Sequence, residues 1–362
     1  MRTPKWSVLV LVAALAWPAA GLERKVVKSA TDRAGNWLVE QHNLGQGTFG
    51  KSRYSELPGF NALVIKALCE SPRQYRETLG PFISEPVKCL LKAQREDGAI
   101  ARPGAGIDGY NTALAILALK ATANPAHAEA IAKAKDYLLK CQGKDGGFSY
   151  DQGRKQGGDL SNTVMDLLAL EAAGLEKGSK AYRKAVAFIR RCQDNPETNP
   201  DLTDTKTDAT GGAYYQPGVS GVGTTATREG RSVPKPYGGM TAALIESLLI
   251  CDLKPDAPEL QAAFRFFRHN YSVKENPGAG MQGYFYYALA FARAMKAAGI
   301  KELELADGKK AAWAEDLAAH LMAIQAKDDS FANPDPKWME DDPVLCTAYA
   351  LQALTVCYEA MK

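Results

Sequence analysis

The feature that most constrains the fold of this chain is an internal repeat of two alternating patterns. The first pattern is an apolar run that ends in Gln and a turn, as at Gln142-Gly-Lys-Asp-Gly-Gly-Phe. Further copies share this form and end at Gln41, Gln94, Gln193, Gln325 and, degraded, Asn270. A pattern that recurs in this way predicts stacked helical units rather than a conventional layered domain.

The second pattern is a polar or aromatic anchor followed by an Ala- and Leu-rich run, as in Thr112-Ala-Leu-Ala-Ile-Leu-Ala-Leu. The six anchors are Asn61, Thr112, Thr163, Thr241, Tyr287 and Thr347. Successive anchors are separated by 51, 51, 78, 46 and 60 residues. The paired patterns predict six helical hairpins, and therefore twelve helices.

Six helical hairpins can stack as an open solenoid or close into a ring. Solenoids usually end in atypical polar repeats, whereas the last repeat here is as apolar as the central ones. We therefore predict an all-α fold, an (α/α)6 toroid, as a single domain over residues 21–362. The long spacing before Thr241 predicts an insertion at residues 194–239.

This insertion is rich in Thr, Gly, Asp and Pro, and its middle lacks apolar periodicity. Loops of this length inside a compact domain are usually functional or disordered. We expect a lid over one opening of the ring, with the aromatic pair Tyr214 and Tyr215 as its contact residues.

The N-terminus has the three-part pattern of a secretory signal peptide. Arg2 and Lys5 precede an apolar run at residues 6–16, and Pro18-Ala-Ala20 forms a small-residue cleavage site. The apolar run is shorter than the roughly 20 residues that span a bilayer. We predict cleavage after residue 20 and export to the periplasm or the extracellular space, as a protein that is not integral to the membrane.

Composition narrows the range of partners. The net charge is only +3, and the chain has no basic stripe, which argues against nucleic acid as a partner. The seven cysteines include several at positions where other repeats carry apolar residues, and they lack the spacing of a metal site. We predict that most of them pack in the core and that the chain needs no metal or cofactor. No feature of the sequence specifies an oligomeric state.

Acidic residues gather where the second helix of a repeat is predicted to begin, at one rim of the ring. They are Asp108, Asp159, Glu340, Asp341 and Asp342. Helix capping is the simpler role for Asp108, Asp159 and Asp342, and a solvated turn is the simpler role for the other two. Clustered carboxylates can also hold a proton for general acid catalysis.

Aromatic residues share this rim. They are Tyr110, Tyr237, Tyr284, Phe285, Tyr286 and Tyr287. An aromatic lining suits an apolar or cationic ligand, and packing in the core is the alternative. Six helix N-termini that converge on the rim would also favour an anion.

The Gln-x-x-Asp-Gly-Gly-Phe turns and Thr-Ala-x-x-Leu-x-Ala-Leu helices resemble the prenyltransferase and squalene-oxidase repeat over about residues 30–360. That repeat builds the (α/α)6 barrels of squalene cyclases and of protein prenyltransferase β subunits. The strings Tyr237-Gly-Gly-Met-Thr-Ala, Glu275-Asn-Pro-Gly and Trp338-Met-Glu-Asp-Asp-Pro look like an exported bacterial subgroup of these proteins. The resemblance implies the toroid fold.

The resemblance also implies where chemistry would lie. Such cyclases protonate their substrate with the middle Asp of an Asp-x-Asp-Asp motif. The nearest match is Glu340-Asp341-Asp342, with Met339 in place of the leading Asp. This match makes Asp341 the candidate acid. The zinc ligands of the prenyltransferases have no counterpart here, since no His lies near Thr347.

Two classes of function follow from these patterns. The first is binding of a lipid, an isoprenoid or another apolar ligand in an aromatic-lined cavity, or of a partner protein on a scaffold. The second is catalysis, by a terpenoid-cyclase-like enzyme that uses Glu340, Asp341 and Asp342, or by a carbohydrate-active enzyme that uses rim carboxylates. The incomplete motifs favour binding.

Overall fold

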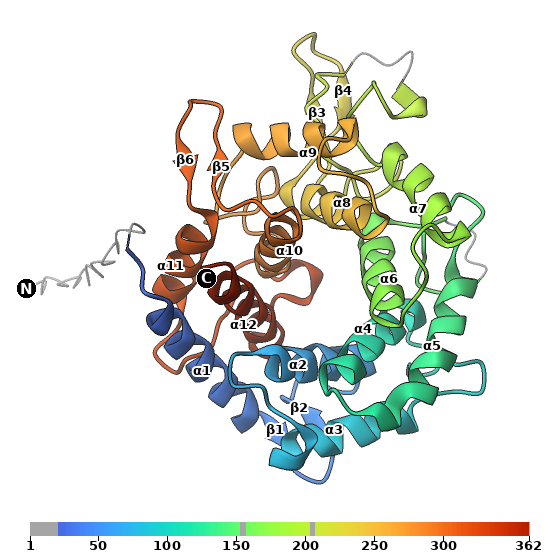
Figure 1. Ribbon diagram of the computed structural model, residues 1–362, viewed down its shortest axis with the longest axis vertical. Helices are drawn as coiled ribbons and strands as arrows, with labels where there is room; N and C mark the ends of the chain where they lie inside the picture. The colour runs from blue at the N-terminus through green and yellow to red at the C-terminus, as the bar shows by residue number, and fades with distance from the viewer. Residues whose placement is uncertain (1–20, 153–156, 203–206, 362) are drawn as a thin grey trace, which may run out of the picture.

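The computed structural model describes residues 21–152, 157–202 and 207–361. The predicted signal peptide at residues 1–20 lies outside them. The described residues contain twelve α-helices that alternate between an outer and an inner ring (Figure 1). The all-α toroid predicted from the repeats is confirmed.

The outer ring comprises α1 (Arg24–Glu40), α3 (Pro81–Lys92), α5 (Ala128–Cys141), α7 (Lys180–Arg191), α9 (Pro258–His269) and α11 (Trp313–Ile324). The inner ring comprises α2 (Pro58–Glu70), α4 (Asp108–Ala121), α6 (Leu160–Ala172), α8 (Gly238–Ile250), α10 (Tyr284–Ala297) and α12 (Pro343–Ala360). Each inner helix packs against the next, and α12 packs against α2, which closes the ring.

The two rings differ in burial because they differ in position. Inner helices are covered on both sides, and α8 is buried at almost every position from Gly238 to Ile250. Outer helices bury one face only, as in α7, where Tyr182, Ala185, Phe188 and Ile189 are buried. The sequence reflects this difference, since outer helices show an amphipathic period and inner helices are apolar on all sides.

The repeated Gln joins neighbouring repeats. The side-chain amide of Gln142 donates to the turn carbonyl of Gly146 at 2.9 Å and to the carbonyl of Ala181, at the start of α7, at 2.8 Å. Gln94 and Gln193 make the equivalent pair of hydrogen bonds. Gly146 follows in the turn at φ +93°, and a Cβ there would lie 2.2 Å from the Lys184 carbonyl. The turn therefore requires glycine to approach α7 this closely.

The anchor residues of five of the six inner helices hold the same turn from its other side; the sixth, Tyr287 of α10, instead donates its hydroxyl to the Ser272 carbonyl. The hydroxyl of Thr163 accepts a hydrogen bond from the backbone N–H of Phe148 at 3.0 Å. Thr112, Thr241 and Thr347 accept equivalent bonds from their own turns. Asn61 does so through its side-chain oxygen. The Gln of the first pattern and the anchor of the second pattern thus hydrogen-bond the same turn from its two sides.

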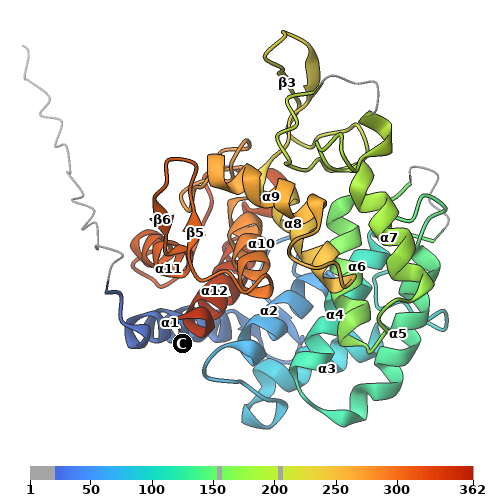
Figure 2. The same cartoon turned by 45° about the horizontal axis from the view of Figure 1, so that its top comes forward.

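The described residues also contain three short antiparallel hairpins, which lie in the connections between helices. They are β1–β2 (His42–Asn43 with Thr48–Phe49), β3–β4 (Thr224–Ala226 with Ser232–Pro234) and β5–β6 (Leu303–Glu304 with Lys310–Ala311). Short 3-10 helices span Glu77–Leu79, Pro125–His127, Pro200–Leu202 and Lys337–Met339. The β3–β4 hairpin belongs to the insertion and projects beyond α8 and α9 (Figure 2).

The cysteines pack as predicted. Cys69, Cys141, Cys192, Cys346 and Cys357 are buried, and all seven cysteines are free thiols. Within the described residues, no helix has the length and apolar character needed to cross a membrane. Those residues also contain no group of three His, Cys, Asp or Glu side chains placed to hold a metal ion.

Candidate functional site

A cavity of about 340 Å³ lies at the centre of the ring, at the end where the inner helices begin. None of its 19 lining residues is charged. Six are tyrosines: Tyr110, Tyr150, Tyr215, Tyr237, Tyr286 and Tyr349. Leucine, phenylalanine and methionine side chains supply most of the remaining surface, including Leu57, Phe60, Leu63 and Met240. The cavity is neutral, aromatic and mostly apolar.

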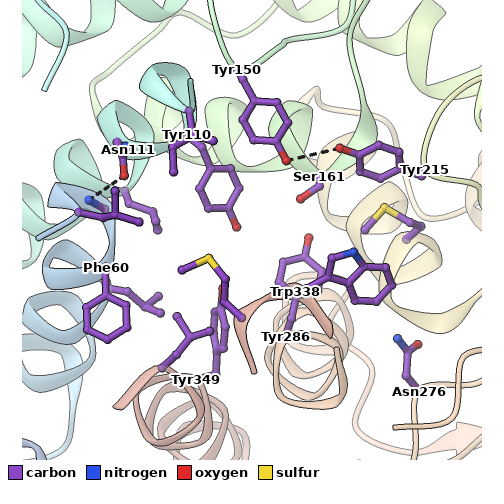
Figure 3. A pocket seen from close by; sticks show the side chains of 18 of the residues that line it. Phe60, Tyr110, Asn111, Tyr150, Ser161, Tyr215, Asn276, Tyr286, Trp338 and Tyr349 are labelled. Carbon is purple, nitrogen blue, oxygen red and sulfur yellow. Dashed lines mark hydrogen bonds between the residues drawn. The ribbon is translucent and has the colours of Figure 1, made fainter. Parts of the chain in front are cut away.

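Four of the six tyrosine hydroxyls are linked in two pairs. Tyr150 and Tyr215 face one another with their oxygens 3.4 Å apart (Figure 3), and Tyr110 shares a hydrogen bond with Tyr349. Burial raises the pKa of Tyr110 to about 12 and raises the pKa of Tyr286 well above its ordinary value. These phenols are therefore protonated at neutral pH and add no charge to the cavity.

Trp338 and Met339 cover the cavity mouth. The indole of Trp338 stacks on Tyr237, with ring centroids 6.0 Å apart and an interplanar angle of 14°. Trp338 and Met339 have φ values of +59° and +68°, in the left-handed region that favours glycine. The neighbouring Lys337 ammonium donates to the Gly221 carbonyl at 2.8 Å and to the side chain of Gln282 at 2.7 Å. The mouth is thus tied to the insertion and to the turn before α10.

The three candidate acids at residues 340–342 do not line this cavity. Glu340 is buried and accepts hydrogen bonds from the backbone N–H groups of Phe285 and Tyr286, at 3.1 and 2.8 Å. Asp342 accepts from two N–H groups at the start of α12. Asp341 is exposed and lies 3.4 Å from the Tyr54 hydroxyl. Glu340 and Asp342 therefore cap helices.

Five inner helices are capped by the repeat that follows them. Asn111 of α4 accepts from the N–H of Gly59 in α2, and Glu340 caps α10 from just before α12. Backbone carbonyls of Tyr150, Tyr215 and Pro277 accept from the first turns of α4, α6 and α8. Two inner helices have a side-chain cap from their own repeat, α6 from Asp159 and α12 from Asp342. These bonds occupy one or two of the first N–H groups of each inner helix, which leaves fewer of them for an anion.

The two rim aspartates, Asp108 and Asp159, have different partners. Asp159 caps α6 by accepting from the backbone N–H of Asn162 at 2.8 Å. Asp108 was predicted to cap α4 but is the first residue of that helix, and its carboxylate pairs with Arg95 at 2.5 Å. Its capping role is taken by the Tyr150 carbonyl, which accepts from Gly109. Neither aspartate is among the cavity-lining residues.

The structure also corrects part of the aromatic rim. Tyr284 and Tyr287 are buried away from the cavity, and their hydroxyls donate to the carbonyls of Val273 and Ser272 at 2.8 and 2.6 Å. Tyr286, between them, lines the cavity instead. The pair in the insertion divides in the same way, since Tyr215 lines the cavity and Tyr214 is buried with a hydrogen bond to Asp194. Helical and extended geometry turn adjacent side chains in different directions.

Comparison with known proteins agrees with this geometry. The family model for the squalene-hopene cyclase N-terminal domain matches residues 83–194. Among solved structures, the type II terpene cyclase MstE from Scytonema, in complex with geranylgeranyl dihydroxybenzoate, superposes with a TM-score of 0.60. It shares 14% sequence identity and is matched over 93% of this chain and 98% of its own. The chain has the fold of a squalene-cyclase-like toroid.

Glycoside hydrolases share the same fold. The unsaturated glucuronyl hydrolase from Streptococcus agalactiae has a TM-score of 0.56 at 13% identity, over 99% of this chain and 98% of that one. The GH76A alpha-1,6-mannanase from Salegentibacter has a TM-score of 0.57 at 11% identity, over 93% and 100%. A search of curated proteins finds no match. At these identities the structural likeness establishes the fold of the squalene-cyclase-like toroid, not its chemistry.

Several cavity residues of the squalene-cyclase-like toroid were not predicted from sequence. They are Tyr150, Ser161, Asn276, Trp338 and Met339. Ser161 was detectable in principle, because it lies in the first turn of an inner helix, as Tyr110 and Tyr286 do. Tyr150 and Trp338 lie in irregular turns, where no periodicity indicates the direction of a side chain.

A polar layer lies below the cavity of the toroid. Lys66 and Gln352 follow the cavity residues Leu63 and Tyr349 by three positions, about one helical turn deeper, and are joined by a hydrogen bond of 3.0 Å. The guanidinium of Arg293 forms two hydrogen bonds with Glu246, at 2.8 and 2.6 Å. These buried pairs satisfy one another, so the charged groups of the inner ring stay below the apolar cavity.

Proposed function

We propose that this toroid binds an elongated apolar ligand of isoprenoid type in its central cavity. The observation that carries the proposal is the cavity lining, which is aromatic and aliphatic and contains no charged side chain among the described residues. Its volume of about 340 Å³ falls in the range of roughly 300–1,000 Å³ typical of small-molecule sites. The MstE structure, which holds geranylgeranyl dihydroxybenzoate in the same fold, adds support.

A cyclase reaction on such a ligand is the second candidate function, favoured by the squalene-hopene cyclase match at residues 83–194. Proton-initiated cyclisation needs an acid that reaches the ligand. Asp341 is exposed and outside the cavity lining, which weighs against it as that acid. A glycosidase ranks lower, because its paired carboxylates should face the substrate and no described carboxylate lines the cavity.

Export of the mature protein is part of this proposal, since the pattern of residues 1–20 is that of a signal peptide. The test is to purify the protein from the periplasm or medium of its host and determine its N-terminus by mass spectrometry. A chain that begins at Gly21 supports export. A chain retained in the cytoplasm with Met1 intact contradicts it.

The binding proposal is tested by native mass spectrometry of that purified protein, with lipid extraction of whatever co-purifies. A stoichiometric apolar ligand is the expected result. Met240→Trp places a larger ring in the cavity, and we expect it to weaken binding at least tenfold. The matched control is Leu44→Trp, because Leu44 is 74% exposed and is not among the lining residues.

Two outcomes would contradict binding in the cavity. One is an empty protein that also fails to take up farnesol or another isoprenoid alcohol in titration. The other is an equal loss of binding in Leu44→Trp and Met240→Trp. Leu57→Trp provides a second cavity-filling variant at a helix boundary, where a larger side chain disturbs packing less, and it should behave like Met240→Trp.

A further inference from the structure

One corner of the cavity carries three hydroxyls. The hydroxyls of Tyr150 and Tyr215 lie together there, and the Ser161 hydroxyl points into the cavity next to them (Figure 3). The described residues offer the Ser161 oxygen no hydrogen-bond partner. Phe60 and Tyr349 lie on the other side of the cavity (Figure 3). A ligand in this space therefore meets a cluster of hydroxyls at one corner and the apolar ring of Phe60 across from it.

A buried carboxylate sets the direction of the hydrogen bonds in this corner. Asp159 is 3% exposed and accepts from the backbone N–H and the side-chain amide of Asn162, at 2.8 and 2.7 Å. It also shares a hydrogen bond with the Tyr215 hydroxyl. A carboxylate accepts and does not donate, so the Tyr215 hydrogen points toward Asp159 and away from the cavity.

This orientation leaves lone pairs on the cavity side. The Tyr215 oxygen faces the Tyr150 hydroxyl, and a phenol oxygen can accept a hydrogen bond as well as donate one. Ser161 can accept as well as donate. The corner thus offers more acceptors than donors to a ligand. A ligand group that donates a hydrogen bond matches it, and a group with acceptors only leaves polar atoms unpaired.

An anionic group fits this corner poorly. The N–H groups of Leu160 and Asn162, at the start of α6, are already bonded to the Tyr215 carbonyl and to Asp159. The Asp159 carboxylate lies directly behind the corner, and like charges in a buried site repel one another. Two of the N–H groups at the start of α6 that could have held a diphosphate are therefore already occupied.

We propose that Tyr150, Ser161 and Tyr215 form a head-group subsite for the hydroxyl of a neutral apolar alcohol, with Asp159 as the residue that orients it. The inference rests on the proposed function, which supplies the apolar tail. It assigns to the ligand a terminal hydrogen-bond donor and excludes a diphosphate or carboxylate head.

The test compares three ligands with one tail and different heads: farnesol, farnesyl methyl ether and farnesyl diphosphate. Calorimetric titration of the mature protein should show farnesol binding at least tenfold more tightly than either of the others. Tyr215→Phe should bring the farnesol and ether affinities within about twofold of one another. Tyr110→Phe is the matched control, because Tyr110 also lines the cavity but bonds to Tyr349, and it should keep the preference.

Asp159→Asn provides a second variant that keeps the helix cap, since Asn is an equally good N-cap residue. Its amide can donate to Tyr215, which frees the Tyr215 hydrogen for the cavity. We expect the ether to gain affinity relative to farnesol in this variant, while the melting temperature stays close to that of the parent protein.

The outcomes distinguish a failure of this inference from a failure of the proposed function. If none of the three ligands binds, the proposed function fails. If all three bind equally, the cavity binds isoprenoid tails and the head-group subsite is wrong. Tighter binding of the diphosphate would overturn the subsite, as would an equal loss of preference in Tyr110→Phe and Tyr215→Phe.

Discussion

At the scale of single residues, Asp166 is an acidic residue at a repeat position where the other repeats carry apolar residues. It lies three positions after the anchor Thr163, and the equivalent residues of the other repeats are Val64, Ala115, Leu244, Ala290 and Ala350. Asp166 is fully buried, and neither carboxylate oxygen has a hydrogen-bond partner. Burial, with a further contribution from Asp159, raises its pKa well above the ordinary value.

We expect Asp166→Ala to stabilise the protein. An unpaired buried polar group costs about 1–3 kcal/mol. The pKa of Asp166 is higher in the folded protein than in the unfolded chain, so the bound proton stabilises the folded state fully below pH 3.8. This stabilisation is lost as the pH rises through the folded pKa. The gain from Asp166→Ala should therefore be larger at pH 8 than at pH 5. Urea unfolding at both pH values measures it.

Asp136→Ala is the control for this prediction, because Asp136 is exposed on α5. Its effect on the free energy of unfolding should lie within about 0.5 kcal/mol. A lower stability of Asp166→Ala at pH 8 would mean that Asp166 has a stabilising partner.

Glu340 illustrates how a plausible catalytic residue can be structural. Glu340→Ala removes the acceptor for the first N–H groups of α10, and we expect it to lower the free energy of unfolding by about 1–3 kcal/mol. Asp341→Asn, at the exposed neighbour, should change it by no more than about 0.5 kcal/mol. Thermal and urea unfolding of the two variants compare them. Equal losses would contradict the capping role.

The sequence could place these acids at a helix start but could not indicate which one is buried. Asp342 next to Pro343 is a local capping signal, and it predicted the correct cap. Glu340 caps a helix that begins 56 residues earlier. Such a long-range contact has no local signature, so a cluster of three acids looked like a catalytic motif.

At the scale of elements, the Gln turn is the unit that joins repeats. Gln193 is fully buried, and its amide donates to the carbonyls of Gly211 and Glu259 at 2.9 and 2.8 Å. Gln193→Met has a similar volume but leaves both carbonyls unpaired. We expect it to lower the free energy of unfolding by about 1–3 kcal/mol, as measured by urea denaturation.

Gln325→Met is the matched control at the same repeat position. Gln325 is only half-buried and makes one such turn bond, to the Asp329 carbonyl at 3.0 Å. Water can replace that bond, so the loss should be smaller than in Gln193→Met. The reverse order would show that the turn bonds do not carry the effect.

The sequence predicted the helical elements better than it predicted the cavity lining. Gln and Thr recur because both hydrogen-bond the same turn, and this made the hairpins and their number predictable. The cavity lining was less predictable, because it depends on which of several adjacent tyrosines points inward. Tyr286 lies in the cavity, whereas Tyr287 and Tyr284, about 100° and about 200° from it around the helix, lie outside.

At the scale of the whole molecule, closure of the ring joins the two ends of the chain. The Arg24 side chain donates to the Tyr358 carbonyl at 2.8 Å, and its guanidinium lies 3.8 Å from the centroid of the Tyr358 ring. These contacts link α1 to α12. A closed ring has no terminal repeat that can fray alone, unlike an open solenoid.

We therefore expect α1, α6 and α12 to share one opening free energy in native-state hydrogen exchange. Arg24→Met should lower the protection of all three helices together, by about 1–2 kcal/mol, because it weakens a charged hydrogen bond and a cation–π contact. Lys25→Met is the control, since Lys25 is exposed and pairs only with Glu23. Loss of protection confined to α1 would show that the ring frays.

The capping of one inner helix by the next repeat has a consequence for how such a chain can vary in evolution. A repeat that is deleted or duplicated would leave its neighbour facing the wrong cap, because Asn111, Glu340 and the capping carbonyls each belong to a particular junction. We therefore expect the number of hairpins to vary less than the length of the turns between them. The long segment between α7 and α8 fits this expectation, because it still supplies the Tyr215 carbonyl that caps α6.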